Sequence, residues 1–246
     1  MKKSNILLLA LLIVTLLVIV AGVIFMKIQF NVSVLQGEGP QKEASREVAD
    51  FSKIKINGKY NVYFTQDSIT SLVLTADENL HEFIRTDVRN DELIIEATQA
   101  IRSRNEMQIM LSGPYLNRVE AMAAAGFYTQ NQLNADKLEI HAIASAIMEI
   151  HGIFETLIVR QSAGSRIQLE GKTETLDVQS NAGGTVDAFN LESEVARAEA
   201  NAGASVNVNA RQLTARANAG GVVNYTGNPV ITEMETNAGG RVRARQ

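Results

Sequence analysis

The chain has 246 residues and a formal net charge of −4, and 46% of its residues are hydrophobic. This near balance of charge gives no support for a nucleic-acid-binding protein, and the absence of cysteine excludes disulfide bonds and a lipidated cysteine. Because tryptophan is absent and histidine is rare, the sequence holds little material for metal or histidine chemistry, and we expect no cofactor.

The first predicted element is one transmembrane helix within an anchor segment of residues 1–28. Residues 6–26 are almost entirely apolar, and about 20 helical residues at about 1.5 Å each cross the roughly 30 Å hydrocarbon core of a bilayer. A cleaved signal sequence has a shorter apolar region and a small-x-small cleavage site. An uncleaved anchor is therefore favoured, with a long cleaved signal as the alternative. Lys2 and Lys3 favour a cytoplasmic N-terminus and an extracytoplasmic remainder.

Residues 29–47 are rich in glycine and charge and predict a linker, and a domain follows over residues 48–246. Its first part, residues 48–115, is irregular but rich in strand patterns, and we expect it to cap the repeats that follow. Asp77 before an apolar pattern predicts a short helix over 77–84. Asn90-Asp91 predicts a hairpin turn, whereas Asn57-Gly58 is typical of a hairpin or of a bend in a β-coil. The runs that predict strands are 51–56, 60–65, 72–74, 86–88, 93–97 and 107–111.

Residues 116–246 repeat a three-residue phrase, most often Asn-Ala-Gly. Its complete and degenerate copies end at Gly126, Ser145, Gly164, Gly183, Gly203, Gly220 and Gly239. The steps between these markers are 19, 19, 19, 20, 17 and 19 residues, a period typical of solenoids. Apolar and polar residues alternate on both sides of each marker, which indicates strands with one buried face. Such a repeat leaves no room for a crossover helix, so we predict an all-β fold, a parallel β-helix.

Stacking the repeats places equivalent residues in columns. Four asparagines precede the tight turns: Asn181, Asn201, Asn218 and Asn237. We expect their amides to bond to one another and to turn backbone, and we expect the glycines to supply the left-handed backbone of the turns. An outward column alternates in charge at Glu199, Arg216 and Glu235, and Asp177 adjoins Arg197 in the next column.

Four short patterns in the first part of the domain carry a family resemblance. They are Phe51-x-x-Ile54-x-Ile56, VYFTQ at 62–66, ADENL at 76–80 and LII at 93–95. Together with the small-residue and glycine repeats, they resemble the putative auto-transporter adhesin, head GIN domain family over about residues 48–246. The resemblance implies a right-handed β-helix in a bacterial envelope protein, an adhesion role and no recognised catalytic residues. The chain departs from the family in its Asn-Ala-Gly turns, where relatives often have Gly-Ser-Gly. It departs also in its predicted membrane helix, where relatives tend to carry an exported or lipidated N-terminus.

A polysaccharide-active β-helix needs carboxylates and basic groups that converge on one outward face. The column of candidate carboxylates contains Glu139, Ile158, Asp177, Arg197, Thr214 and Glu233, so apolar, basic and hydroxyl side chains interrupt it. His141 and His151 are about half a coil apart and are expected on opposite sheets, and His81 falls on the predicted helix. No nucleophile, phosphate loop or metal-spaced cluster emerges, so we predict no enzyme, with a carbohydrate-active enzyme as the alternative.

The last predicted strand carries three outward arginines, Arg241, Arg243 and Arg245, with Val242 and Ala244 in the inward register. The first interpretation is that their charge deters end-to-end stacking at an edge strand. The second is a comb for anionic groups such as phosphorylated glycans or lipid head groups, because alternate residues of a strand lie roughly 6.6–7 Å apart.

Taken together, these features predict a non-catalytic, single-pass bacterial membrane protein whose extracytoplasmic domain is an adhesion or assembly scaffold. The expected partners are the membrane, through the N-terminal helix, and an envelope glycan or another envelope protein. A sensory or scaffolding domain for other envelope proteins is a further interpretation, and the oligomeric state is left open.

Overall fold

The computed structural model describes residues 12, 14–16, 20, 22 and 34–245. The chain divides into two units, Met1–Leu35 and Gln36–Gln246. In the first unit, the described residues between 12 and 22 are helical, and the rest of the predicted membrane helix lies outside the described residues. Within the part that is described, no helix is both long enough and apolar enough to cross a membrane.

Almost all of the remaining chain is β-strand or the connections between strands. The elements before the repeats are β1 (Leu35–Gln36), β2 (Gln41–Arg46), β3 (Lys53–Asn57), β4 (Asn61–Gln66), β5 (Ser71–Asp77), the 3-10 helix η1 (Glu78–Phe83), β6 (Ile84–Arg89), β7 (Glu92–Ala97), β8 (Ile101–Arg102) and β9 (Gln108–Gly113). The repeats contain β10 (Arg118–Met122), β11 (Gly126–Thr129), β12 (Leu133–Ile143), β13 (Ile147–Gln161), β14 (Arg166–Ser180), β15 (Thr185–Asn201), β16 (Ser205–Asn218), β17 (Val222–Thr226), β18 (Val230–Asn237) and β19 (Arg241–Ala244).

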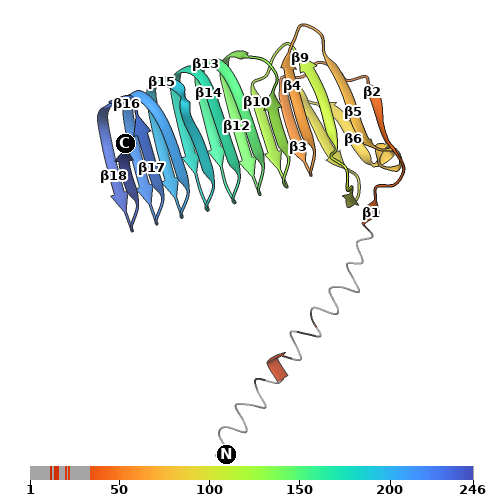
Figure 1. The fold of residues 1–246 in the computed structure, drawn as a ribbon, viewed down its shortest axis with the longest axis horizontal. Helices are drawn as coiled ribbons and strands as arrows, with labels where there is room; N and C mark the ends of the chain where they lie inside the picture. The colour runs from red at the N-terminus through yellow and green to blue at the C-terminus, as the bar shows by residue number, and fades with distance from the viewer. Residues whose placement is uncertain (1–11, 13, 17–19, 21, 23–33, 246) are drawn as a thin grey trace, which may run out of the picture. The chain divides into compact units, whose positions relative to one another are not determined.

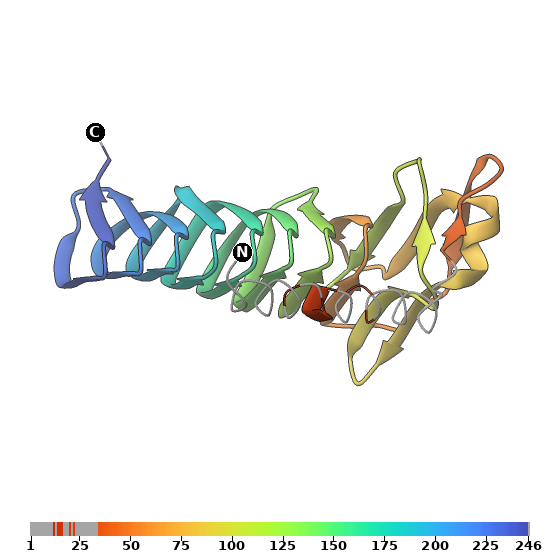
Figure 2. The same cartoon turned by 90° about the horizontal axis from the view of Figure 1, so that it is seen from below.

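The repeats form a β-solenoid with the spacing of about 19 residues that the sequence predicts. Successive strands pair in parallel at equivalent residues, as where Leu157 of β13 lies beside Leu176 of β14 and Val159 lies beside Val178. These aliphatic side chains are fully buried, because the period of two along a strand sends every second side chain into the coil. Figures 1 and 2 show the coils following one another along one axis.

The two irregular steps of the repeat have a structural cause in β15. The register shifts between β14 and β15 and again between β15 and β16, and residues 189–191 of β15 have no partners in β16. The 20-residue repeat therefore bulges at the bend that lies away from its tight turn. The following 17-residue repeat has fewer residues at the same bend. Leu191 of the bulge is buried, and Phe189 is partly exposed.

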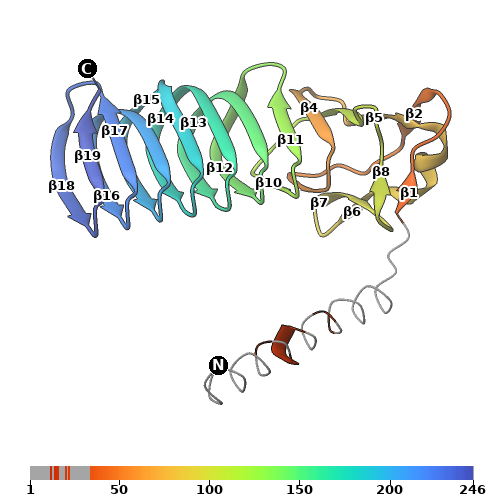
Figure 3. The ribbon, with the colours of Figure 1, turned by 60° about the horizontal axis from the view of Figure 1, so that its bottom comes forward.

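The coils of the N-terminal half continue the solenoid, but they do not stack in chain order. β3 pairs in parallel with β7 on one side and with β10 on the other, and β4 pairs in the same way with β9 and β11. The coil of residues 53–66 therefore lies between the coil of 92–113 and the coil of 118–129 (Figures 1 and 3). Asn57 and Gly58 bend this first coil between β3 and β4.

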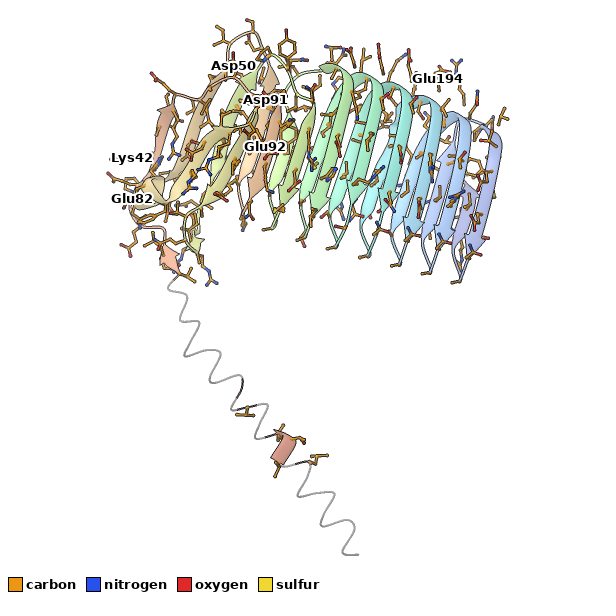
Figure 4. All side chains as sticks on the ribbon, turned by 180° about the vertical axis from the view of Figure 1, so that it is seen from behind. Lys42, Asp50, Glu82, Asp91, Glu92 and Glu194 are labelled. Carbon is orange, nitrogen blue, oxygen red and sulfur yellow. The ribbon has the colours of Figure 1, made fainter. Side chains whose placement is uncertain are left out.

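Antiparallel strands close the N-terminal end of the solenoid. β5 pairs with β9, and β2 pairs with β5. β2 lies inside the segment 29–47, which the sequence predicts as a linker, so the structure differs from that prediction and paired structure begins before residue 48. The strand is mostly exposed and carries no apolar run, which is why the hydrophobic pattern does not reveal it. Figure 4 shows Lys42 of β2 and Glu82 of η1 at this end.

Of two local predictions for this half, the hairpin is confirmed and the short helix is confirmed without its predicted cap. β6 and β7 form the predicted antiparallel hairpin, and Asn90 and Asp91 adopt the positive φ values of its turn, 51° and 65°. The predicted helix over 77–84 is the 3-10 helix η1, but the Asp77 side chain does not cap it. The buried Asp77 carboxylate instead accepts hydrogen bonds from Ser103 and Asn105, each at 2.6 Å.

The tight turns of the repeats need left-handed backbone at two residues. Ala202 and Gly203 have φ of 50° and 74°, and the Ala204 N–H donates to the Asn201 carbonyl at 3.1 Å, the pattern of a type I′ turn. The sequence pattern predicts left-handed backbone at the glycine alone, whereas in the structure the preceding alanine adopts it as well. The next turn holds it there, because the Gly203 N–H donates to the Ala219 carbonyl at 3.1 Å.

Candidate functional site

The predicted asparagine column is a hydrogen-bonded ladder. The amide of Asn201 donates to Asn181 at 3.1 Å, that of Asn218 to Asn201 at 3.0 Å, and that of Asn237 to Asn218 at 3.2 Å. The amides of Asn201 and Asn237 also donate to the glutamate two residues earlier, at 2.8 and 2.9 Å. These amide bonds are made to side chains, whereas the prediction included bonds from the amides to turn backbone. The turn backbone bonds instead to other backbone groups, within one turn and between neighbouring turns. The column therefore joins neighbouring coils.

Two of the candidate carboxylates are held by neighbouring basic groups. Glu139 lies 2.6 Å from Nε2 of His141, and both oxygens of Asp177 accept from the Arg160 guanidinium, at 3.1 and 3.2 Å. Burial works against ionisation of Glu139, but the hydrogen bond and charge of His141, together with the charges of Arg118 and Lys137, outweigh it and keep the pKa of Glu139 below its ordinary value. His151 follows the turn and His141 precedes it, so the two rings belong to different ladders.

The charges of the outward column form contacts between coils. Arg216 pairs in register with Glu199 on one side and Glu235 on the other, as predicted. Its guanidinium lies 2.7 Å from Glu233 and 3.4 Å from Glu235. The hydrogen bond and charge of Glu233 raise the pKa of Arg216. Across residues 34–245 and the described helical positions, no group of three or more histidine and carboxylate side chains is placed to hold a metal ion.

The three arginines of the last strand have different surroundings. Arg243 donates from Nε to the Asn224 side chain at 2.9 Å, and the Arg245 guanidinium lies 4.5 Å from the centre of the Phe189 ring. Arg241 is exposed beside the last tight turn. Two of the side chains thus rest on earlier coils. Both interpretations of this cluster, an edge guard and an anion comb, stay predictions.

A groove that the sequence does not reveal lies beside the first coils. It holds about 970 Å³ and is lined by the tip of the β6–β7 hairpin, the segment before β10, the start of β12 and the outer face of β3 and β7. Its lining includes Lys53, Glu92, Tyr115, Asn134, Asp136 and Lys137. These residues come together only because the coil of 53–66 lies between two coils formed later in the chain. No repeat or motif marks them in the sequence.

Hydrogen bonds between the segments that line the groove hold its walls in place. Gln66 donates from Nε2 to the carbonyls of Pro114 and Asn134, at 3.0 and 3.1 Å, and accepts the Asn134 N–H at 2.8 Å. The hairpin tip is fixed where the Asp91 carbonyl accepts the Ser52 N–H at 3.2 Å and its carboxylate accepts the Ser52 hydroxyl. Figure 4 marks Asp91 and Glu92 on this part of the molecule. The groove is therefore preformed.

A tight ion cluster lies beside the groove. Glu120 lies 3.1 Å from the Lys55 ammonium and 2.9 Å from the Arg118 guanidinium. Burial opposes ionisation of Glu120, but these two partners together hold its pKa below the ordinary value. Since Arg118 is also a lining residue, the cluster fixes one cation of the groove in position.

A second hollow continues the groove along the wide bends of the repeats. It holds about 570 Å³ and shares residues 134–136 with the groove. Farther along, Lys172 pairs with Glu192 at 3.2 Å and Arg211 pairs with Glu194 at 3.5 Å. Figure 4 shows Glu194 on the upper edge of the solenoid.

Comparison with known proteins gives the fold and the family. The fold is similar to that of a putative adhesin from Bacteroides fragilis, with a TM-score of 0.77 and 21% identity over 86% of this chain and 100% of that one. A putative lipid binding protein from Parabacteroides distasonis gives 0.69 and 18% over 87% and 100%, and a putative adhesin from Parabacteroides merdae gives 0.65 and 19% over 86% and 99%. No curated protein matches the sequence. The model of one family matches residues 50–229, and the chain belongs to that family, described as "Putative auto-transporter adhesin, head GIN domain".

Proposed function

We propose that this chain is a non-catalytic adhesion or assembly scaffold of the bacterial envelope. The observation that carries the proposal is the pairing of outward polar side chains along the solenoid. The asparagine ladder, the Arg160–Asp177 pair and the Arg216–Glu233 pair all join one coil to the next. Groups committed to one another in this way stiffen a rod and do not converge on a reacting atom. Membership of a family described as an adhesin head supports the same reading.

Adhesion is tested by comparing bacteria with and without this chain on surfaces coated with envelope extract from neighbouring cells. We expect the strain that carries the chain to be retained and the deletion strain to be lost, with recovery on complementation. Cross-linking on that surface should then capture an envelope glycan or an envelope protein. Equal retention of both strains would contradict the proposal.

The proposal includes a single uncleaved membrane anchor and an extracytoplasmic solenoid. The apolar run of residues 6–26 and the basic Lys2 and Lys3 support it. Membrane fractions should hold the full-length chain, resistant to carbonate extraction. An N-terminus that begins after Gly22 in the mature protein would overturn the anchor and leave the adhesion proposal standing.

One observation favours a second candidate, a polysaccharide-active enzyme. Glu139 lines the groove and is 2.6 Å from His141, so an acid and an imidazole meet beside an open hollow. If this pair is catalytic, the chain should release new reducing ends from envelope polysaccharide, and Glu139→Gln should abolish that release. We expect no release from either protein. A sensory or scaffolding role would be indicated by capture of envelope proteins without any glycan.

A further inference from the structure

We propose that the groove of about 970 Å³ is a binding site for an extended glycan chain of low net charge. This inference rests on the proposed adhesion function and gives it a site and a class of ligand. It is carried by three properties of the lining: an exposed ring, a near balance of fixed charges, and continuity with a second hollow.

The exposed ring belongs to Tyr115 at the rim of the groove. Its exposed fraction is 70%, whereas the adjacent Leu116 is 2% exposed and packs into the domain. Leu116 therefore anchors the segment and leaves the ring outside. A tyrosine ring offers a flat apolar face with a polar tip, which suits the C–H face and the hydroxyl groups of a sugar ring.

The charges of the groove nearly balance. Four cations line it, namely Lys53, Arg89, Arg118 and Lys137, against three acids, Glu92, Asp136 and Glu139. A polyanion would meet the three carboxylates, and a polycation would meet the four basic groups. A ligand with little net charge avoids both of these like-charge repulsions.

The polar groups of the lining suit hydroxyl ligands. Within the described part of the chain, Lys137 and Asp136 have no ion pair within 4.0 Å, so an ammonium donor and a carboxylate acceptor are available on one wall. Asn90 and Asn117 add amides, each of which both donates and accepts. Sugar hydroxyls also donate and accept, and an acyl chain could use none of these groups.

The shape of the groove indicates a chain and not a single sugar. The groove opens at residues 134–136 into the second hollow of about 570 Å³, whose lining includes the buried Phe154 and Thr173. A ligand that passes this junction contacts both hollows. The walls are preformed, because Gln66 ties the Pro114 and Asn134 backbones together, so little ordering is required on binding.

The test uses the full-length chain, purified in mild detergent and immobilised. The probes are neutral hexasaccharides of glucose, mannose, galactose and N-acetylglucosamine, the matching disaccharides, and hyaluronan as a polyanion. We expect at least one neutral hexasaccharide to bind with little dependence on salt, and its disaccharide to bind at least about tenfold more weakly.

Tyr115→Ala should weaken hexasaccharide binding about tenfold. The matched control is Ile69→Ala, since Ile69 is exposed to almost the same fraction, 69%, and does not line the groove. Asp136→Ala, at the junction, should weaken the hexasaccharide more than the disaccharide. Unchanged thermal unfolding of each variant establishes that the fold is intact.

Three results would overturn the inference: no neutral hexasaccharide binds, only hyaluronan binds, or Tyr115→Ala binds as well as Ile69→Ala. Its failure is distinguishable from failure of the adhesion proposal. If the wild-type and Tyr115→Ala chains support equal retention of cells on envelope extract, the groove is not the site and the scaffold function stands. If the wild-type chain supports no retention, the function itself is wrong.

Discussion

At the residue scale, Asn201 occupies the middle of the amide ladder. Its side chain donates to Asn181 and Glu199 and accepts from Asn218. Asn201→Ala should therefore cost about 1–3 kcal/mol of unfolding free energy, because partly buried partners lose their bonds. Asn237→Ala should cost less, since Asn237 is exposed. Urea melts compare the two variants, and equal, negligible losses would show that the ladder adds no stability.

A second residue-scale feature is the polar side chain of Gln161 inside the coil. Gln161 is 1% exposed, its Oε1 accepts from Ser180, and its Nε2 has no hydrogen-bond partner among the described residues. The amide fits because the next coil has Gly184 above it, where an added Cβ would lie 1.6 Å from Nε2. Glycine thus avoids a close contact with the Gln161 amide at this position, and its backbone conformation does not call for glycine.

Gly184→Ala should destabilise the domain by about 1–3 kcal/mol through overpacking. In a Gln161→Ala background the same substitution should cost little, because the methyl group then enters vacated space. A double-mutant cycle by chemical denaturation measures this coupling. As a control, Gly221→Ala places its Cβ 2.1 Å from the Ala200 carbonyl oxygen, which no side-chain truncation relieves. Additive effects at Gly184 and Gln161 would refute the packing argument.

The residues of the ladder could be predicted from the sequence, whereas those of the groove could not. Asn201 and Asn218 are equivalent positions of successive repeats, so a fixed period is enough to stack them. Tyr115, Asn134 and Glu92 share no period. They meet because β3 pairs with β7 on one side and with β10 on the other. Packing between residues far apart in the sequence determines this order.

At the scale of the element, the tight turn places alanine in a backbone region that favours glycine. Ala202→Gly should be neutral or slightly stabilising, because relief of left-handed strain offsets the greater freedom of the unfolded chain. Ala202→Val should destabilise by at least about 1–2 kcal/mol, since branching at Cβ worsens the same strain. Thermal unfolding of both variants is the measurement. A valine variant as stable as the glycine variant would contradict the observed φ of 50°.

Arg46 of the edge strand β2 joins the strand to η1 and β6. Arg46 donates to the carbonyls of His81 and Ile84 and to the Thr86 hydroxyl. Arg46→Ala should leave these part-buried acceptors without a donor and loosen β2 from η1 and β6, at a cost of about 1–3 kcal/mol. Hydrogen exchange should become faster in residues 41–46 and 72–77 and stay unchanged in β14. Unchanged exchange throughout would show that Arg46 does not hold the strand.

The elements differ in how far the sequence predicts them. The repeats, the β6–β7 hairpin and the inward alternation follow from local patterns, each of which agrees with the structure. β2 escapes prediction because an exposed edge strand needs no apolar face. The stacking order of the first coils escapes it because parallel ladders between β3 and β10 leave no mark on either strand.

At the scale of the whole molecule, the solenoid domain consists of a closed N-terminal end and a row of coils joined by side-chain ladders. The last coil pairs on one side through β18 with β16 and through β19 with β17. The outward asparagines and several charged pairs join neighbouring coils of the solenoid, and the groove beside the first coils is a preformed hollow with a balanced lining. This arrangement supports holding a partner more than transforming it.

A non-catalytic, glycan-binding scaffold is tested most sharply by the size of envelope polysaccharide before and after binding. The full-length chain is loaded with polysaccharide from envelope extract, washed and eluted, and the polysaccharide is sized by chromatography. We predict that the polysaccharide is retained and that its size distribution is unchanged after prolonged incubation. Shortened polysaccharide would establish an enzyme, and polysaccharide that passes without retention would remove the glycan-binding scaffold.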